Sequence, residues 1–65
     1  MKYASKRAYI AINTFTKNKE EQESIRTYLI ESPIGDEYDL LTPEDWEMGN
    51  KFEDWCENEG IAVWE

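Results

Sequence analysis

The sequence predicts an α+β fold, a small β-α-(β)-α-β domain in which two helices cover one face of a short antiparallel sheet. Three observations support this prediction. An alternating run of β-branched and aromatic residues lies near the N-terminus, two segments carry helix-capping patterns, and a short apolar run ends the chain. With 65 residues the chain has the length of one small domain, so we expect residues 1–65 to fold as a single unit.

The first strand is expected at Arg7 to Phe15. Ala8, Ile10 and Ile12 alternate there with a second set of residues that is also partly apolar. β-branched and aromatic side chains favour strands. Because both faces of the run carry apolar side chains, we expect a central strand that is covered on both sides.

The first helix is expected from about Lys19 to Glu31. Asn18 is a favourable N-cap residue, and Glu21 three residues later completes a capping-box pattern. Three apolar residues at helical spacing form the predicted buried stripe, namely Ile25, Tyr28 and Leu29.

The second helix has the strongest local signal in the chain. Thr42 is a favourable N-cap residue and Pro43 occupies the first helical position, with acidic residues following in the first turn. Gly60 is a natural residue to end this helix. The pair Gly49-Asn50 falls inside it, so the pattern leaves open whether the helix is kinked or split there.

The connecting segments are short. Ser32 to Gly35 is expected to be a turn, because Pro33 cannot continue the preceding helix. Tyr38 to Leu41 is predicted to be either a short strand or an extended loop. Ile61 to Glu65 is expected to be the final strand, which pairs with the first strand.

Charge is divided unevenly along the chain. Residues 1–19 carry five of the seven cations and no carboxylate, whereas residues 20–65 carry all fifteen carboxylates and two cations. An acidic body of this kind repels nucleic acid and attracts basic surfaces, including surfaces that normally hold nucleic acid. We therefore expect a basic protein partner and no direct contact with nucleic acid.

The second helix separates into two faces when it is projected at 100° per residue. One face carries the apolar residues Met48, Phe52, Trp55 and Cys56. The opposite face carries the candidate binding residues Glu44, Glu47, Glu53, Asp54 and Glu57, to which we add Asp36, Glu37 and Asp39 of the preceding segment. The acidic face is either a solvated surface or a recognition surface, and the sequence leaves both open.

Trp46 projects between Glu53 and Glu57, away from the apolar face. It is either an exposed aromatic anchor for a partner or a side chain that packs against residues 32–41. Aromatic residues inside polar patches are typical of interface hot spots.

Composition argues against an enzyme. The chain has no histidine, and its single cysteine, Cys56, lies on the apolar face, where we expect a buried structural thiol. The acidic run at residues 36–39 lacks the spacing and the glycine of a calcium-binding loop, so neither a metal nor another cofactor is expected. No apolar run approaches the length of a membrane span, and a lone thiol suits the reducing cytoplasm.

One stretch resembles a known family. The run Arg7-Ala8-Tyr9-Ile10-Ala11-Ile12, an acidic helix with Ile25 and Leu29, and then Glu37-Tyr38-Asp39-Leu40 resemble the opening of the ArdA-type antirestriction proteins. Members of that family are acidic DNA mimics, much longer than this chain, that occupy the DNA site of restriction-modification enzymes. The resemblance covers about the first 45 residues and implies a DNA-mimic inhibitor.

These observations together predict a small acidic inhibitor or regulator that binds the nucleic-acid-binding surface of a host protein in the cytoplasm. Antirestriction, anti-CRISPR and similar anti-defence roles belong to this class. The alternative is a small phage or plasmid accessory or adaptor protein that acts through homodimerisation, with its charge serving solubility alone.

Overall fold

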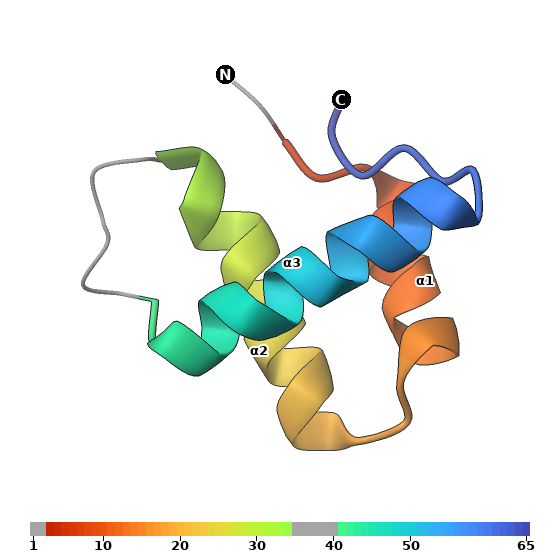
Figure 1. Ribbon diagram of the computed structural model, residues 1–65. Coiled ribbons are helices and arrows are strands. Elements are labelled where there is room, and N and C mark those ends of the chain that lie inside the picture. Colours follow the sequence, from red (N-terminus) through yellow and green to blue (C-terminus); the bar gives the residue numbers. More distant parts are fainter. Residues whose placement is uncertain (1–2, 35–40) are drawn as a thin grey trace.

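The computed structural model describes residues 3–34 and 41–65, and these residues form three α-helices and no β-sheet (Figure 1). Helix α1 spans Lys6–Phe15, α2 spans Lys19–Glu31, the 3-10 turn η1 spans Ser32–Ile34, and α3 spans Pro43–Asn58. Helix α3 crosses in front of α2 in Figure 1 and also packs against α1. The predicted α+β fold is therefore wrong.

The predicted first strand is helix α1. Ser5 caps this helix by accepting a hydrogen bond from the Ala8 backbone N–H at 3.1 Å. The side chains that face the core follow helical spacing, and they are Ala8, Ala11, Ile12 and the partly buried Phe15. Ile10, which fits the alternating pattern, is 65% exposed. Two alanines with high helix propensity and a serine cap thus prevail over the β-branched residues.

The structure confirms the helix predicted from about Lys19 to Glu31. This helix, α2, begins and ends as expected, and the Asn18 side chain accepts hydrogen bonds from the backbone N–H groups of Glu20 and Glu21. The side chain of Glu21 does not complete the predicted capping box. It accepts a hydrogen bond from the Thr16 hydroxyl at 2.6 Å instead. The backbone N–H of Asn18 instead donates to the same hydroxyl. The predicted turn at Ser32 to Gly35 begins with η1, and Gly35 lies outside the described residues.

Helix α3 also begins and ends as the sequence predicts. Thr42 and Asp45 form a reciprocal capping box, in which each side chain accepts from the other residue's backbone N–H. Gly60 follows the C-cap with φ of +75°, a conformation that glycine adopts without strain. The helix runs without interruption through Gly49 and Asn50.

Gly49 sets the distance between α2 and α3. A Cβ atom at this position would fall inside the van der Waals radii of the Tyr28 ring carbons. The Tyr28 ring therefore lies directly on the α3 backbone, and both residues are buried. The glycine that we considered a potential helix kink is instead the point of closest helix packing.

The predicted final strand is an extended segment that makes one isolated antiparallel bridge, between Ala4 and Trp64. Ser5 reinforces this bridge. Its backbone N–H donates to the Val63 carbonyl at 2.7 Å, and its hydroxyl donates to the Ala62 carbonyl at 2.6 Å. One bridge is too short to form a sheet, but it holds the two ends of the described chain together, as Figure 1 shows.

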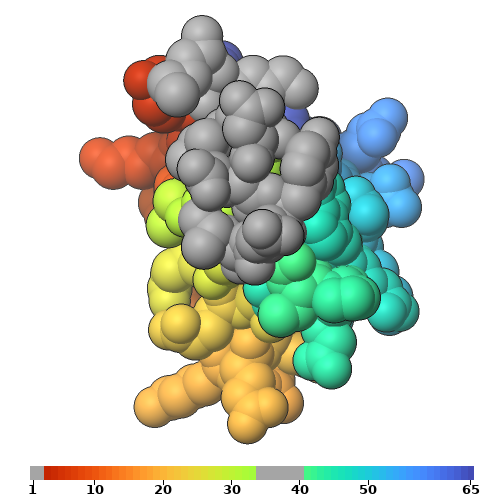
Figure 2. Space-filling model, turned by 90° about the vertical axis from the view of Figure 1, so that its left-hand side faces the viewer, coloured from red at the N-terminus to blue at the C-terminus, as the bar shows by residue number. Residues whose placement is uncertain are grey.

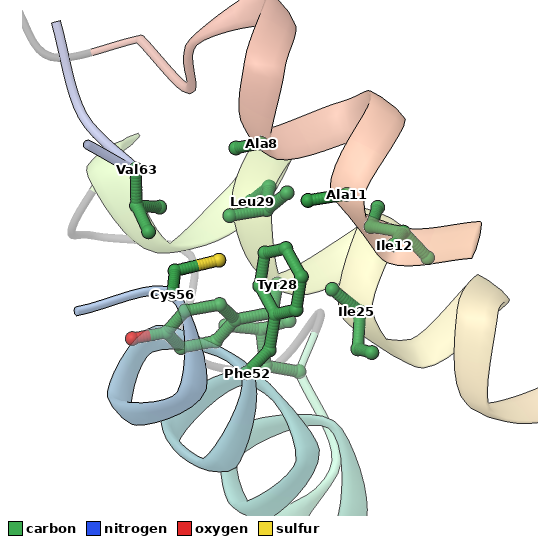
Figure 3. Close-up of a cluster of buried hydrophobic side chains, with 10 residues drawn as sticks. Ala8, Ala11, Ile12, Ile25, Tyr28, Leu29, Phe52, Cys56 and Val63 are labelled. Atoms are coloured by element: carbon green, nitrogen blue, oxygen red, sulfur yellow. The ribbon is translucent and has the colours of Figure 1, made fainter. Parts of the chain in front are cut away.

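The hydrophobic core lies where the three helices and the C-terminal segment meet (Figure 3). Its largest fully buried side chains are Phe52, Ile12, Ile25, Leu29 and Cys56. Burial of each large aliphatic or aromatic side chain stabilises the fold by about 1.5 to 3 kcal/mol. Cys56 is a free, buried thiol, which confirms the expectation of a structural cysteine.

We expect Gly49→Ala to lower the free energy of unfolding by about 1 to 3 kcal/mol, because the added methyl group overpacks the Tyr28 ring. Alanine favours a helix over glycine by about 1 kcal/mol, which offsets part of this loss. Urea denaturation measures the change. Asp54→Ala, at an exposed position of the same helix, is the control and should change stability by no more than about 0.5 kcal/mol. A Gly49→Ala protein as stable as the control variant would contradict the close packing.

Alkaline pH should destabilise the protein through Cys56. Burial, with a smaller contribution from the Glu53 charge, raises the pKa of the Cys56 thiol from 9.0 to about 11. The native state therefore holds this proton more tightly than the unfolded state. The resulting stability is fully present below pH 9 and is lost as the pH rises towards 11.

Urea denaturation at several pH values compares the wild type with Cys56→Ala. The wild type should lose about 2 kcal/mol more than the variant between pH 9 and pH 11. Tyr28 is present in both proteins, so its own titration cancels in the difference. Parallel pH profiles would show that the thiol is not held neutral by burial.

Candidate functional site

Four of the predicted acidic residues form an exposed row on α3, which we call the acidic face. They are Glu44, Glu47, Asp54 and Glu57, and all four are exposed. Their spacing in the helix places them around the side opposite the buried residues Gly49, Phe52 and Cys56. The structure thus brings these four residues to one surface, as the projection predicts.

Few cations balance this face. Lys51 pairs with Glu47 at 3.4 Å, and both side chains are largely exposed. The other ion pair within residues 3–34 and 41–65 joins Arg26 to Glu23 on α2 at 4.0 Å. Exposed pairs of this kind contribute about 0 to 1 kcal/mol. The acidic face therefore keeps most of its negative charge.

One end of the acidic face borders a hollow between α2 and α3. The hollow has a volume of about 300 Å³, and four carboxylates line it, namely Glu20, Glu21, Glu44 and Glu47. Figure 2 views the side where the first half of α2 (orange and yellow) lies beside the first turns of α3 (green). The N-terminal carboxylates of α2 thereby extend the acidic surface beyond α3. The sequence predicted a capping role for Glu21 and no binding role for either Glu20 or Glu21.

The other end of the acidic face borders a groove along the C-terminal segment. This groove has a volume of about 500 Å³ and lies between the second half of α3 and residues 61–64. Glu53, Asp54 and Glu57 line its helical wall, and Ile61 and Val63 contribute to the opposite wall. The groove thus combines an acidic wall with an apolar one.

Glu53 differs from the other predicted face residues, because it is half-buried and serves as a hydrogen-bond acceptor. Its Oε1 atom accepts from the Tyr28 hydroxyl, and its Oε2 atom accepts from Trp64 Nε1 at 3.1 Å. One carboxylate therefore joins α2, α3 and the C-terminal segment. The helix projection missed this role. It gives the direction of Glu53 around the α3 axis, but it does not show which other segments cover that side of the helix.

Glu53 contributes to the raised pKa values of two buried neighbours, Tyr28 and Cys56. Burial is the largest cause that raises the pKa of the Tyr28 hydroxyl far above its usual range, and the hydrogen bond to Glu53 and the Glu53 charge add to it. Burial and the same charge raise the pKa of Cys56. Both groups therefore stay neutral at physiological pH, and the local charge is that of Glu53.

Trp46 is half-buried and packs against the core. Its ring meets the Tyr28 ring edge to face, with centroids 5.5 Å apart and an interplanar angle of 78°. It also lines a small hollow together with Ser32 and Pro33. Of the two hypotheses for Trp46, the structure supports packing, with Ser32 and Pro33 nearby, and the side chain still contributes to a surface hollow.

Two residues of this region carried no functional prediction, namely Tyr28 and Trp64. A signal was available, because a buried tyrosine hydroxyl and a buried indole N–H usually find an acceptor. Three other predicted site residues, Asp36, Glu37 and Asp39, lie outside the described residues, as does most of the expected short strand at 38–41.

The described carboxylates are arranged as a surface rather than as a metal site. Within the described part of the chain, no three cysteine or carboxylate side chains converge closely enough to hold a metal ion. The same residues contain no helix long and apolar enough to cross a membrane.

The chain matches no protein-family model, and no curated protein or solved structure resembles it at a significant level. The resemblance to the opening of the ArdA-type antirestriction proteins gains no support from these comparisons and stays a hypothesis.

We expect Glu53→Gln to destabilise the fold by about 1 to 3 kcal/mol, because the tyrosine hydroxyl and the indole N–H lose a charged acceptor. Asp54→Asn is the matched control, since it removes the same charge from an exposed neighbour and should change stability by no more than about 0.5 kcal/mol. Thermal unfolding followed by circular dichroism measures both. Equal stability of the two variants would show that Glu53 is not a structural acceptor.

Proposed function

We propose that this protein binds a basic surface of another protein, a surface that normally holds nucleic acid, and acts there as an inhibitor or regulator. In this proposal the carboxylates of the acidic face take the place of phosphates, and the protein works in the cytoplasm. The observation that carries the proposal is the row of four exposed carboxylates on α3, which has Lys51 as its neighbouring cation.

The charge density of the row is nearer to that of a single nucleic-acid strand than to that of a duplex. At 1.5 Å per residue, Glu44 and Glu57 lie about 20 Å apart along the helix axis, and the steps between successive carboxylates of the row are about 4.5, 10.5 and 4.5 Å. One strand of DNA carries a charge about every 3.4 Å of helix axis. The acidic face therefore carries about half the charge density of one nucleic-acid strand and about a quarter of that of a duplex.

Two carboxylates at the C-terminal end of α3 lie where they are unfavourable for folding. Helix α3 has no basic residue in its last turn, and Glu57 and Glu59 lie at its C-terminal end. A helix C-terminus carries partial negative charge, so each carboxylate there costs about 0.3 to 1 kcal/mol. Because these residues do not stabilise the helix, a role in binding is the simplest reason to place them there.

The alternative of an adaptor that acts through homodimerisation has less support. Such a protein should expose a contiguous apolar patch of several hundred Å². Among the described residues, the large apolar side chains that are exposed are Tyr3, Ile10 and Ile30, which belong to three separate segments. A few exposed apolar side chains are usual on protein surfaces.

The test uses the wild type beside a fourfold variant, E44Q/E47Q/D54N/E57Q, which keeps the shape of the acidic face and removes its charge. Both proteins are immobilised, exposed to a bacterial lysate and eluted with increasing salt. The proposal requires a nucleic-acid-binding protein that the wild type retains and the variant does not, and that an added DNA oligonucleotide releases. Equal retention by both proteins would contradict the proposal.

Binding to such a partner should depend strongly on salt. The acidic face is exposed, and charges of this kind are screened within about 8 Å at physiological ionic strength. We expect the Kd measured by calorimetry to rise by about an order of magnitude between 50 and 200 mM salt. The fourfold variant should bind weakly at both concentrations. A Kd that stays constant across this range would contradict a role for surface charge.

A further inference from the structure

A small hollow lies where the C-terminal end of α2, the helix α3 and the C-terminal segment meet. It has a volume of about 230 Å³ and is lined by three aromatic residues, one carboxylate and two small residues, namely Tyr28, Trp46, Trp64, Glu53, Ser32 and Pro33. The hollow is below the usual size range of sites for drug-sized ligands, so it suits the end of a single side chain.

The carboxylate in this hollow has no counter-charge within the described part of the chain. Glu53 accepts hydrogen bonds from two neutral donors, the Tyr28 hydroxyl and the Trp64 indole. Neither ion pair of the described residues involves it. A carboxylate offers about four lone-pair positions, so two neutral donors leave about half of its acceptor capacity unused.

The aromatic lining favours a cation in the same place. Faces of tryptophan and tyrosine rings attract ammonium and guanidinium groups through their quadrupoles. The buried Tyr28 ring contacts both tryptophan rings, with centroids 5.5 Å from Trp46 and 6.4 Å from Trp64. Three aromatic side chains and a negative charge therefore surround one small volume.

We propose that this hollow binds the guanidinium group of an arginine side chain of the partner protein. The inference rests on the proposed function, because a nucleic-acid-binding surface supplies the arginine. A guanidinium is planar, stacks on aromatic rings and carries N–H donors at its edges, so it can use both the rings and the spare acceptor positions of Glu53. Glu53 also lines the groove beside Asp54 and Glu57, which connects the hollow to the acidic face.

The experiment uses the amide of N-acetyl-arginine as the probe and follows the three indole N–H signals of the folded protein by NMR. Trp46 and Trp64 should shift with a Kd in the millimolar range, and Trp55 should not. Trp55 is an internal control, because its ring packs against Phe15 and Phe52 away from the hollow. The amide of N-acetyl-citrulline has nearly the same shape and no charge, and it should cause no shift.

Variants separate charge from aromatic contact. Glu53→Gln should weaken arginine binding about tenfold. Trp46→Leu keeps the charge and should weaken binding about threefold. An unshifted Trp55 signal in the same spectrum verifies that each variant is folded. The inference is overturned if arginine moves none of the signals, if citrulline moves them equally, or if both folded variants bind arginine as the wild type does.

The fourfold variant E44Q/E47Q/D54N/E57Q distinguishes this inference from the proposed function. It should lose the partner and keep the arginine-dependent shifts of Trp46 and Trp64. If arginine binds but no partner depends on the acidic face, the proposed function fails alone. If the partner depends on the acidic face but Trp46→Leu, once shown to be folded, binds it as the wild type does, the hollow is not where the partner's arginine lies.

Discussion

The contact between Tyr28 and Gly49 is the constraint on which the rest of the structure depends. The absence of a side chain at Gly49 lets the aromatic ring lie on the α3 backbone, and this contact fixes the separation of the two longest helices. The same ring then places its hydroxyl at Glu53, which also accepts from Trp64. Core packing, the half-buried charge and the position of the C-terminal segment are therefore consequences of one close approach.

Ion pairs contribute little to the stability of the fold. Both ion pairs of the described residues join neighbours within one helix and lie at the surface, so they add little stability. Stability comes instead from the buried apolar cluster, from the side-chain caps at Ser5, Asn18 and Thr42, and from the bonds to Glu53. Of the six carboxylates on α3, three take part in these contacts, namely Asp45, Glu47 and Glu53.

The sequence predicted α2 and α3 well because their limits are set by local chemistry, through the caps Asn18 and Thr42 and the ending at Gly60. It failed for α1 because Arg7 to Phe15 satisfies both periodicities. The β-branched residues favour a strand, whereas the Ser5 cap, the two alanines and the packing of Ala8 and Phe15 against the other helices favour a helix. The exposed part of the acidic face was predictable from helix geometry. The role of Glu53 was not, since its two donors come from Tyr28 and Trp64, residues that only the tertiary fold brings to it.

The hydrogen bond from the Ser5 hydroxyl to the Ala62 carbonyl joins residues that are 57 positions apart in the chain. Closing a loop of that length in an unfolded chain costs about 3 to 4 kcal/mol of entropy beyond a constant. The cost falls once the helices have formed, because they already bring the two ends near each other. We therefore expect α2 and α3 to pack together first. The contact between Ser5 and the C-terminal segment should form last.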